Sequence, residues 1–405
     1  MSDILIAGNL YAHVHVIVDD QIGTHSFQKV SIKDNMNALG STFSLVFPNR
    51  WVLTQNRFRL LANKRVRVIL RDRNIMVVGR VEQIGTQVDS DKHSISVSGR
   101  DNTGDLIDCS PNNFEEFNNL TLKQIAEKVC APFDIGVIDY AKDTHVFVKA
   151  KFRPGEKVFA FLDRVSKQRG LLLNSVVSGT AARPRMNVSI AKVGQFSHVK
   201  ERLDYRNILS CQTKVDVTKV FSEYNVISQT SEVENIEDDF GEVTQETSAI
   251  GTVKDDSIDR YRPLTIIANK QATNEEALSR AQWEHVRRLG EMLQFKILVN
   301  GWRTRDNDIW RPNRKIRVNY PHAGLDGIYL ITGCEYIYGA GESIKTALTL
   351  THKDAFTPSP TVSVKADPNG NLGFNLDNVQ WEKFQTISED PSGPKETPQP
   401  DLPRI

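Results

Sequence analysis

The feature that most constrains the fold is a pattern that occurs twice, once near each end of the chain. Residues 63–68, Asn-Lys-Arg-Val-Arg-Val, match residues 313–318, Asn-Arg-Lys-Ile-Arg-Val, in kind at nearly every position. Each copy is followed by a turn, then by an apolar stretch with a central glycine (Gly79 or Gly333), and then by an alternating stretch. Such alternation is typical of strands with one buried face. Three strands in the same order indicate a duplicated β module.

Duplication has a consequence for assembly. When three copies of a chain with two similar modules form a ring, six modules surround one axis, one at roughly every sixty degrees. A three-fold object of this kind can sit flush on a six-fold one. We therefore expect an α+β fold that is mainly β. Two similar β-barrel domains, at residues 1–108 and 206–356, flank a small α/β domain at residues 109–205.

The middle of the chain changes from strand periodicity to helix periodicity. Thr121 and Gln124 match a capping box, and the apolar residues that follow recur at helical spacing. A second run with this spacing begins at Val158, and Gly170 is a natural stop for it. We predict two helices here and interpret their apolar stripes as core.

The second β domain carries two additions. We predict a helix at residues 274–291, where Arg280, Arg287 and Arg288 form a charged face that is either solvated or turned toward a partner. An acidic stretch at residues 231–259 has few apolar residues, which indicates a long, mobile insertion. A docking loop for a basic neighbour is the alternative interpretation.

Residues 357–405 are predicted to form an extended, proline-rich tail, because the many prolines exclude regular helix and strand over most of it. Phe374, Leu376 and Trp381 are unusual residues for a solvated tail. We predict that they lie against another protein in an extended form.

Residues 98–110 join the first β domain to the middle domain. The stretch is rich in glycine, asparagine and aspartate, which favour positive φ and side-chain hydrogen bonds to the backbone. No nucleophile–base pair or metal-ligand set lies nearby, so we interpret it as a junction rather than an active-site loop. The candidate junction residues are Arg100, Asp101, Gly104, Asp105 and Asp108.

The overall charge excludes a strongly nucleic-acid-binding or membrane-binding chain. The 405 residues include 51 Lys and Arg against 50 Asp and Glu, a formal net charge of +1. The four cysteines lie far apart without a Cys-x-x-Cys motif, which fits reduced thiols in a protein made in the cytosol. No stretch approaches the ~20 apolar residues of a membrane span.

Known catalytic motifs are missing, and we expect no enzyme activity, no metal and no cofactor. His13 and His15 share a strand face but lack an evident third ligand, so a metal pair is the less favoured interpretation. Glu156 and Asp163 could be imagined as the carboxylate pair of a glycosidase. Their positions, in a Pro-Gly turn and on the polar side of a helix, instead favour solvated charges.

Several segments resemble one known family. Residues 100–110, Arg-Asp-Asn-Thr-Gly-Asp-Leu-Ile-Asp-Cys-Ser, resemble the junction of the baseplate hub proteins of Mu-like contractile-tailed phages. The first ninety residues match only in pattern. Segments that resemble its middle domain lie at 121–126, 130–133, 153–156 and 169–172, and those that resemble its last domain at 262–264, 283–284, 301–303 and 310–313.

The resemblance implies a homotrimer whose paired barrels form a pseudo-six-fold ring, with a channel for DNA. The same fold is implied for the T-even phage hub and for the hub part of type VI secretion spikes. Implied partners are other copies of the chain, the tail tube or a tube-initiator protein, the central spike protein and other baseplate proteins. DNA is implied only as a transient passenger. The implied location is the tail baseplate of the virion, after synthesis in the host cytoplasm.

Three alternatives differ in class. The first is the equivalent hub of a phage-like contractile injection device. The second is a cell-wall-degrading tail enzyme. The third is a nucleic-acid-binding module that uses the basic first domain, although near-neutral overall charge favours only weak, salt-sensitive binding.

Overall fold

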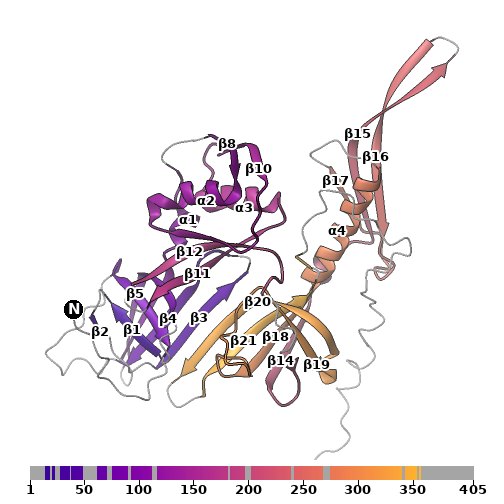
Figure 1. Ribbon diagram of the computed structural model, residues 1–405. Helices are drawn as coiled ribbons and strands as arrows, with labels where there is room; N and C mark the ends of the chain where they lie inside the picture. The colour runs from indigo at the N-terminus through magenta and orange to yellow at the C-terminus, as the bar shows by residue number, and fades with distance from the viewer. Residues whose placement is uncertain are drawn as a thin grey trace, which may run out of the picture.

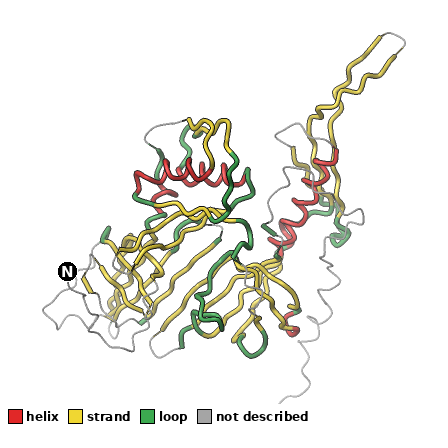
Figure 2. The backbone as a smooth tube through the Cα atoms, viewed as in Figure 1, coloured by secondary structure: helices red, strands yellow, loops and turns green. Residues whose placement is uncertain are grey.

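The computed structural model describes residues 14–18, 21–22, 28–36, 38–48, 62–70, 75–89, 93–111, 116–180, 183–196, 202–238, 241–267, 274–339, 343–353 and 355–356. Strands dominate these residues and helices are few, which confirms the expected α+β, mainly β class (Figure 2).

Two sets of strands form the large sheet. We call the first set the first module: β1 (Val14–Val18), β2 (Gln21–Ile22), β3 (Lys29–Asn35), β4 (Thr42–Pro48), β5 (Arg65–Leu70), β6 (Ile75–Val88) and β7 (His93–Asp101). The second module consists of β13 (Arg202–Leu203), β14 (Ile208–Val215), β18 (Leu293–Asn300), β19 (Arg314–Tyr320), β20 (Leu325–Gly339) and β21 (Lys345–His352). A 3-10 turn, η4 (Pro321–Ala323), connects β19 to β20.

The two modules form one continuous sheet because β3 pairs with β20 (Figure 1). The strand order is β14-β18-β21-β20-β3-β4-β7-β6-β5-β1-β2, with β19 pairing β20 and β13 pairing β19. A single hydrophobic cluster includes side chains from both modules, among them Val30 and Phe43 from the first and Phe295 and Tyr336 from the second.

The expectation of two β-barrels is therefore corrected. Among the described strands, no ladder closes either module on itself. β20 is long enough to join the two modules: its first half pairs with β19, and its second half, from Gly333 to Gly339, continues past β19 and pairs with β3. The end strand β3 of the first module is thereby paired with the second module rather than with β1 or β2.

The duplication itself is visible in backbone details. Asn63 and Asn313 both adopt positive φ, 66° and 64°, just before β5 and β19. Their amides donate to the carbonyls of Val81 (2.6 Å) and Ile331 (2.9 Å). The pairing register then shifts immediately after Val81 in one module and immediately after Ile331 in the other. The same strand order, the same left-handed Asn and the same bulge recur at a constant sequence spacing.

This spacing corrects one detail of the sequence comparison. Gly79 was matched with Gly333, but the bulges align Gly333 with Gln83. Each glycine lets a different group come close to the backbone. A Cβ on Gly79 would lie 2.0 Å from the Arg100 carbonyl oxygen, and one on Gly333 would lie 2.3 Å from the Asn35 side-chain oxygen. The strands match, but these two glycines do not.

The middle of the chain packs around its own core. Its elements are α1 (Gly104–Asp108), β8 (Glu116–Thr121), α2 (Leu122–Cys130), η2 (Ala131–Phe133), β9 (Gly136–Asp139), β10 (Val146–Lys151), α3 (Val158–Lys167), β11 (Leu172–Thr180) and β12 (Arg183–Ala191). The predicted capping box is confirmed: the Thr121 hydroxyl accepts from the Gln124 amide at 3.3 Å, and the Gln124 side chain accepts from the Thr121 amide at 2.9 Å. The predicted apolar stripes of α2 and α3 are buried together.

A long hairpin projects from the second module (Figure 1). β15 (Glu223–Asp238) pairs with β16 (Gly241–Lys254), and β17 (Pro263–Ile267) runs parallel to β15. The acidic stretch thus lies largely in a strand ladder rather than in an irregular loop. The predicted helix is α4 (Asn274–Met292), which packs so closely on β16 that a Cβ on Gly251 would lie 2.2 Å from the Ala277 backbone. Before the hairpin, η3 (Val217–Lys219) turns the chain out of β14.

Within the described part of the chain, no helix is both long and apolar enough to span a bilayer.

Asn313 provides a test of how the middle of the chain is attached to the second module. Its buried side chain accepts from the Gly194 amide (2.6 Å) and donates to the Lys192 carbonyl (2.9 Å), whereas Asn63 has the same φ but is exposed. We expect Asn313→Ala to lower the free energy of unfolding by about 2–4 kcal/mol, through lost hydrogen bonds and φ strain. Asn63→Ala is the matched control and should cost only about 1 kcal/mol, from φ strain.

Urea unfolding of both variants measures the difference. Equal losses at the two sites would contradict a linking role for the Asn313 side chain.

Candidate functional site

The predicted junction residues occupy the end of β7 and the short helix α1. Arg100 and Asp101 are the last residues of β7, and Gly104, Asp105 and Asp108 lie in α1. They do not share one environment. Asp101 and Gly104 are buried, whereas Asp105 and Asp108 are exposed. The structure therefore divides them into an inner and an outer set.

The inner set centres on the Asp101 carboxylate. One oxygen accepts from the Thr103 amide (2.8 Å) and hydroxyl (2.5 Å), and the other accepts from the Ser41 amide (2.7 Å). Burial raises the pKa of Asp101, against the hydrogen bonds from Thr103 and Ser41, which lower it. The Ser41 hydroxyl also lies 3.4 Å from the hydroxyl of Ser175 on β11. Asp101 thus fixes the turn out of β7 beneath the middle sheet.

A second acid, Asp34, lies at the seam between the modules. It is on β3, directly opposite Cys334 of β20. Burial raises the pKa of Asp34 to about 6, with a further rise from the nearby Asp101 carboxyl and an opposing attraction from Arg311. Next to it, the Met36 amide donates to the Thr332 carbonyl at 2.7 Å. The seam therefore places two carboxyl groups in a poorly solvated environment.

The outer set centres on the Arg100 guanidinium. Its Nε donates to both carboxylate oxygens of Glu82, at 2.9 and 3.1 Å, and its Nη2 donates to Asp108. Glu82 is the bulge residue of β6, because the register shifts between Val81 and Gln83. These hydrogen bonds raise the pKa of Arg100 and lower that of Asp108. Arg100 therefore ties the bulge to α1.

The backbone after α1 continues this attachment. Lys157 donates through Nζ to the Asp108 carbonyl, and the Val158 amide donates to the Cys109 carbonyl at 3.0 Å. The start of α3 is thereby fixed to the junction. The approach is close here: a Cβ on Gly104 would lie 3.2 Å from the Arg100 side chain, which would have to shift slightly. The arrangement positions domains and presents no reactive group.

Glu156 is held in a fixed ion pair. Arg164 donates to its two carboxylate oxygens at 2.8 Å each, and the Arg153 amide donates at 2.8 Å. The Arg164 hydrogen bonds lower the pKa of Glu156. A glycosidase acid needs a raised pKa instead. Asp163 is paired with Lys167 at 2.6 Å on the same helix, so both carboxylates serve structural contacts.

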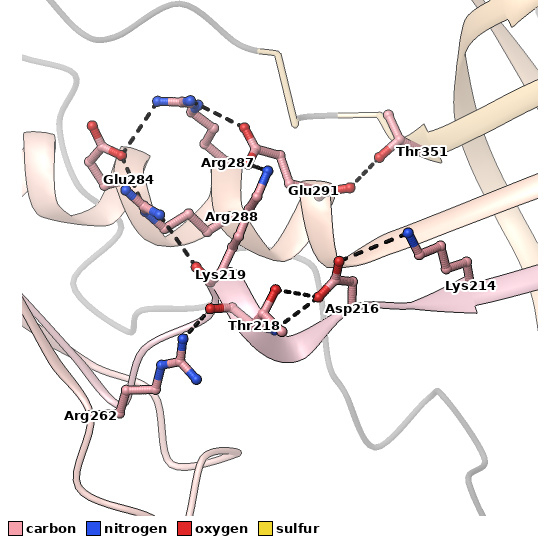
Figure 3. Close-up of polar contacts among 11 residues, drawn as sticks. Lys214, Asp216, Thr218, Lys219, Arg262, Glu284, Arg287, Arg288, Glu291 and Thr351 are labelled. Carbon is pink, nitrogen blue, oxygen red and sulfur yellow. Dashed lines mark hydrogen bonds and ion pairs between the residues drawn. The ribbon is translucent and has the colours of Figure 1, made fainter.

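The basic face of α4 is only partly solvated. The buried Glu284 lies 2.9 Å from Arg280 and 3.6 Å from Arg288, and Arg287 lies 3.2 Å from Glu291. Figure 3 shows Arg287 between Glu284 and Glu291, and Arg288 directed toward the η3 turn, where it donates to the Lys219 carbonyl at 3.4 Å. Thr351 on β21 donates to the Gly290 carbonyl at the end of the helix. Arg288 and Thr351 thus link α4 to η3 and to the second module.

The remaining predictions concern other positions. Phe374, Leu376 and Trp381 lie outside the described residues, as does His13. His15 is buried on β1 rather than solvated. Within the described ranges, no group of three or more His, Cys, Asp or Glu side chains is arranged to hold a metal ion.

Sequence reasoning missed Asp34, Ser41 and Asn313. Asp34 lies in an ordinary alternating strand, and nothing local marks it as a residue of the seam. Asn313 carried a usable signal, because the same residue type precedes both repeats and Asn tolerates positive φ better than most residues.

Asp34 predicts a pH dependence of stability. Its folded pKa of about 6 exceeds the ordinary value of 3.8, so the folded state binds the proton more tightly. The stabilising contribution is complete below about pH 4 and is lost as pH rises through 6. We expect Asp34→Asn to raise the free energy of unfolding, relative to the unmutated protein, by on the order of 1–3 kcal/mol more at pH 7.5 than at pH 4.

Urea midpoints at the two pH values provide the measurement. The exposed Asp105 serves as the control through Asp105→Asn. An identical effect of Asp34→Asn at both pH values would rule out this role.

Glu156→Gln is expected to destabilise the protein by about 1–3 kcal/mol, because it removes the charged partner of Arg164 and weakens three hydrogen bonds. Asp163→Asn, which breaks the more exposed pair with Lys167, should cost less than about 0.5 kcal/mol. Thermal unfolding compares the two variants. A larger effect at Asp163 would contradict this assignment.

Two family models match the chain. The description "Baseplate hub protein gp44-like, second domain" matches residues 103–181, which begin inside the junction. The description "Mu phage baseplate assembly protein GpP, fourth domain" matches residues 273–359, which begin at α4 and include most of the second module.

Individual proteins match over longer spans. The baseplate hub protein gp44 of Escherichia phage Mu is 28% identical over 304 residues, 74% of this chain and 77% of that protein. The 43 kDa tail protein of prophage MuSo2 from Shewanella oneidensis is 25% identical with a TM-score of 0.70, over 85% of this chain and 99% of the other. An E. coli type VI secretion component shares the fold, with a TM-score of 0.50 at 11% identity, over 85% of this chain and 79% of that one.

The family models and the gp44 and MuSo2 proteins are described as tail or baseplate proteins. The prediction that the chain is a structural protein and not an enzyme is thereby confirmed. The two family models match α1 with most of the middle domain, and α4 with strands β18 to β21 of the second module. The resemblance inferred from the sequence is confirmed, and the chain is related to the baseplate hub proteins of Mu-like contractile-tailed phages.

Proposed function

We propose that this protein is the structural hub of a contractile phage tail baseplate and works as a homotrimer. The observation that carries the proposal is the duplicated module, with its matching Asn63 and Asn313 turns and matching bulges. Three such chains supply six equivalent modules. A ring of this kind is three-fold in sequence and nearly six-fold in backbone shape.

This dual symmetry suits a joint between two kinds of neighbour. The nearly six-fold strand framework matches a six-fold tail tube or tube-initiator protein. Features that occur once per chain, such as the β15–β16 hairpin with α4, repeat three times in the ring and match a three-fold central spike. The proposed partners are therefore further copies of this chain, the tube, the spike and other baseplate proteins, in the tail of the virion.

The two modules that the sequence predicted as closed barrels are open sets of strands in this proposal. Among the described strands each module is an open set, so in this proposal the ring closes through neighbouring chains rather than within a domain. A closed ring of six modules leaves a central hole, which we propose as the channel for DNA. The proposed domains are residues 1–108, 109–205, 206–356 and the tail 357–405, and synthesis takes place in the host cytoplasm.

The trimer is tested by light scattering coupled to gel filtration at high protein concentration. We expect three times the 45.7 kDa chain mass. Electron micrographs of the same fraction should show rings with a central hole. A monomer at every concentration, or a compact particle without a hole, would contradict the proposed hub architecture.

A further inference from the structure

One strand segment has an exposed edge at the place where its repeat is paired. Residues 83–88 of β6 pair with β7 on one side, and no other described strand pairs with them. All six residues are exposed. The bulges align this segment with residues 333–338 of β20, which pair with β3 of the first module. The first module thus lacks a contact that the second module makes.

The strand that would pair with residues 83–88 by analogy with β3 is its equivalent in the second module, β14. β3 pairs β4, and β14 pairs β18, so β14 occupies the place in the second module that β3 occupies in the first. β14 ends the strand order of the large sheet, and no described strand pairs with its other edge. Within one chain the two edges are far apart in that order. An unpaired edge is a ready template for another strand.

The internal seam fixes the register that the two edges would adopt. In the seam, Tyr336 lies opposite Ile32. Counting from the bulges places Thr86 at the position of Tyr336. Following the ladders through β4 and β18 places Thr213 at the position of Ile32. Thr86 therefore aligns with Thr213.

The same register aligns the remaining residues without a gap. The other pairs are Gln83–Asp216, Ile84–Val215, Gly85–Lys214, Gln87–Gln212 and Val88–Cys211.

We propose that residues 83–88 of β6 form an antiparallel ladder with β14 of a second copy of this chain, in this register. The proposal rests on the ring described above and names the surface that joins its subunits. The internal β3–β20 seam is the template, so the chain would use one kind of strand junction both within and between subunits.

The side chains on one face of this ladder support the register. Ile84 and Val215 are each 38% exposed and Val88 is 60% exposed in the single chain. The register sets Ile84 against Val215 and Val88 against Cys211, so apolar meets apolar. In the internal seam, Cys334 at the position of Ile84 and Val30 at the position of Cys211 are buried. A shift of one residue would turn these apolar groups to opposite faces.

The two edges differ, so the contact is head-to-tail. Copies joined in this way continue to add until the rotation between them closes a ring. Thr86 and Thr213 replace the larger Tyr336 and Ile32 of the internal seam, which makes the proposed ladder less apolar than its template. Folding within a chain can therefore be complete before subunits join.

The test is disulfide cross-linking of Thr86→Cys/Thr213→Cys in a chain whose exposed Cys109 is replaced by serine. Directly opposed residues of an antiparallel ladder have Cα atoms about 4.5–5.5 Å apart, within the span of a disulfide. Mild oxidation should give covalent dimers and trimers on non-reducing gels, with the trimer as the largest product. Each single variant alone should stay unlinked, and so should Gln87→Cys/Thr213→Cys, which presents its thiols on opposite faces.

The outcomes distinguish a failure of the proposed ladder from a failure of the proposed trimer. A protein that has trimer mass by light scattering but gives no covalent product would overturn the ladder and leave the trimer standing. A protein that is monomeric and unlinked would contradict both. Linkage by the Gln87 variant equal to that of the Thr86 variant would overturn the register.

A second measurement does not depend on thiol chemistry. Ile84→Lys and Val215→Glu should each raise the concentration needed for trimer formation at least about tenfold, and the double variant should recover much of the loss through the new charge pair. Val148→Lys is the matched control, because Val148 is a 78% exposed apolar residue on β10, away from both edges. Equal weakening by Val148→Lys, or none by Ile84→Lys and Val215→Glu, would overturn the proposal.

Discussion

The antiparallel ladder between β3 and β20 is the interaction on which the rest of the structure depends. Seven residue pairs, from Asn35 opposite Gly333 to Lys29 opposite Gly339, unite two modules that are separated in sequence by the whole middle domain. Because main-chain hydrogen bonds need a fixed register, this ladder sets the position of one module relative to the other more strictly than apolar contact alone could. The Asp34 carboxyl lies within it, where burial raises its pKa to about 6.

Polar contacts link the middle domain to both modules, in addition to the apolar contact of Leu39 with the middle-domain core. Asp101 binds the turn that carries Ser41, and Ser41 in turn lies beside Ser175. On the other side, Asn313 joins the loop at Lys192 to the second module. Polar groups of this kind are costly when a partner is lost, so each contact favours one orientation and penalises others. The main cores of the modules and of the middle domain remain separate clusters, while their relative placement is specified by a few hydrogen bonds.

The sequence predicted the parts of the fold that depend on local pattern. The mainly β class, the capping box at Thr121 and the helix beginning at 274 follow from periodicity and end signals, which act over one or two turns of chain. Its error was the closed barrel, because closure depends on the partner of each module's end strand, and the end strand β3 pairs with β20 of the other module. β3 and the second half of β20 are about three hundred positions apart in the sequence, and no pattern within either strand predicts that they pair. The predicted junction residues lie at the end of β7 and in α1, but the division between buried Asp101 and exposed Asp108 arises only from packing.

The two modules differ most in the connection between their equivalent edge strands. In the first module a short loop joins β3 to β4, whereas in the second the whole hairpin and α4 lie between β14 and β18. The insertion leaves the ladder of β14 with β18 intact apart from one irregularity near Ile208, because it enters and leaves at neighbouring strand ends. A duplicated module can therefore acquire a feature that occurs once per chain without losing its strand framework. In a ring of three chains, such insertions would give a three-fold pattern to a six-fold frame. The hydrogen bonds from Thr351 to the Gly290 carbonyl and from Arg288 to the Lys219 carbonyl would hold each insertion at a fixed angle to that frame.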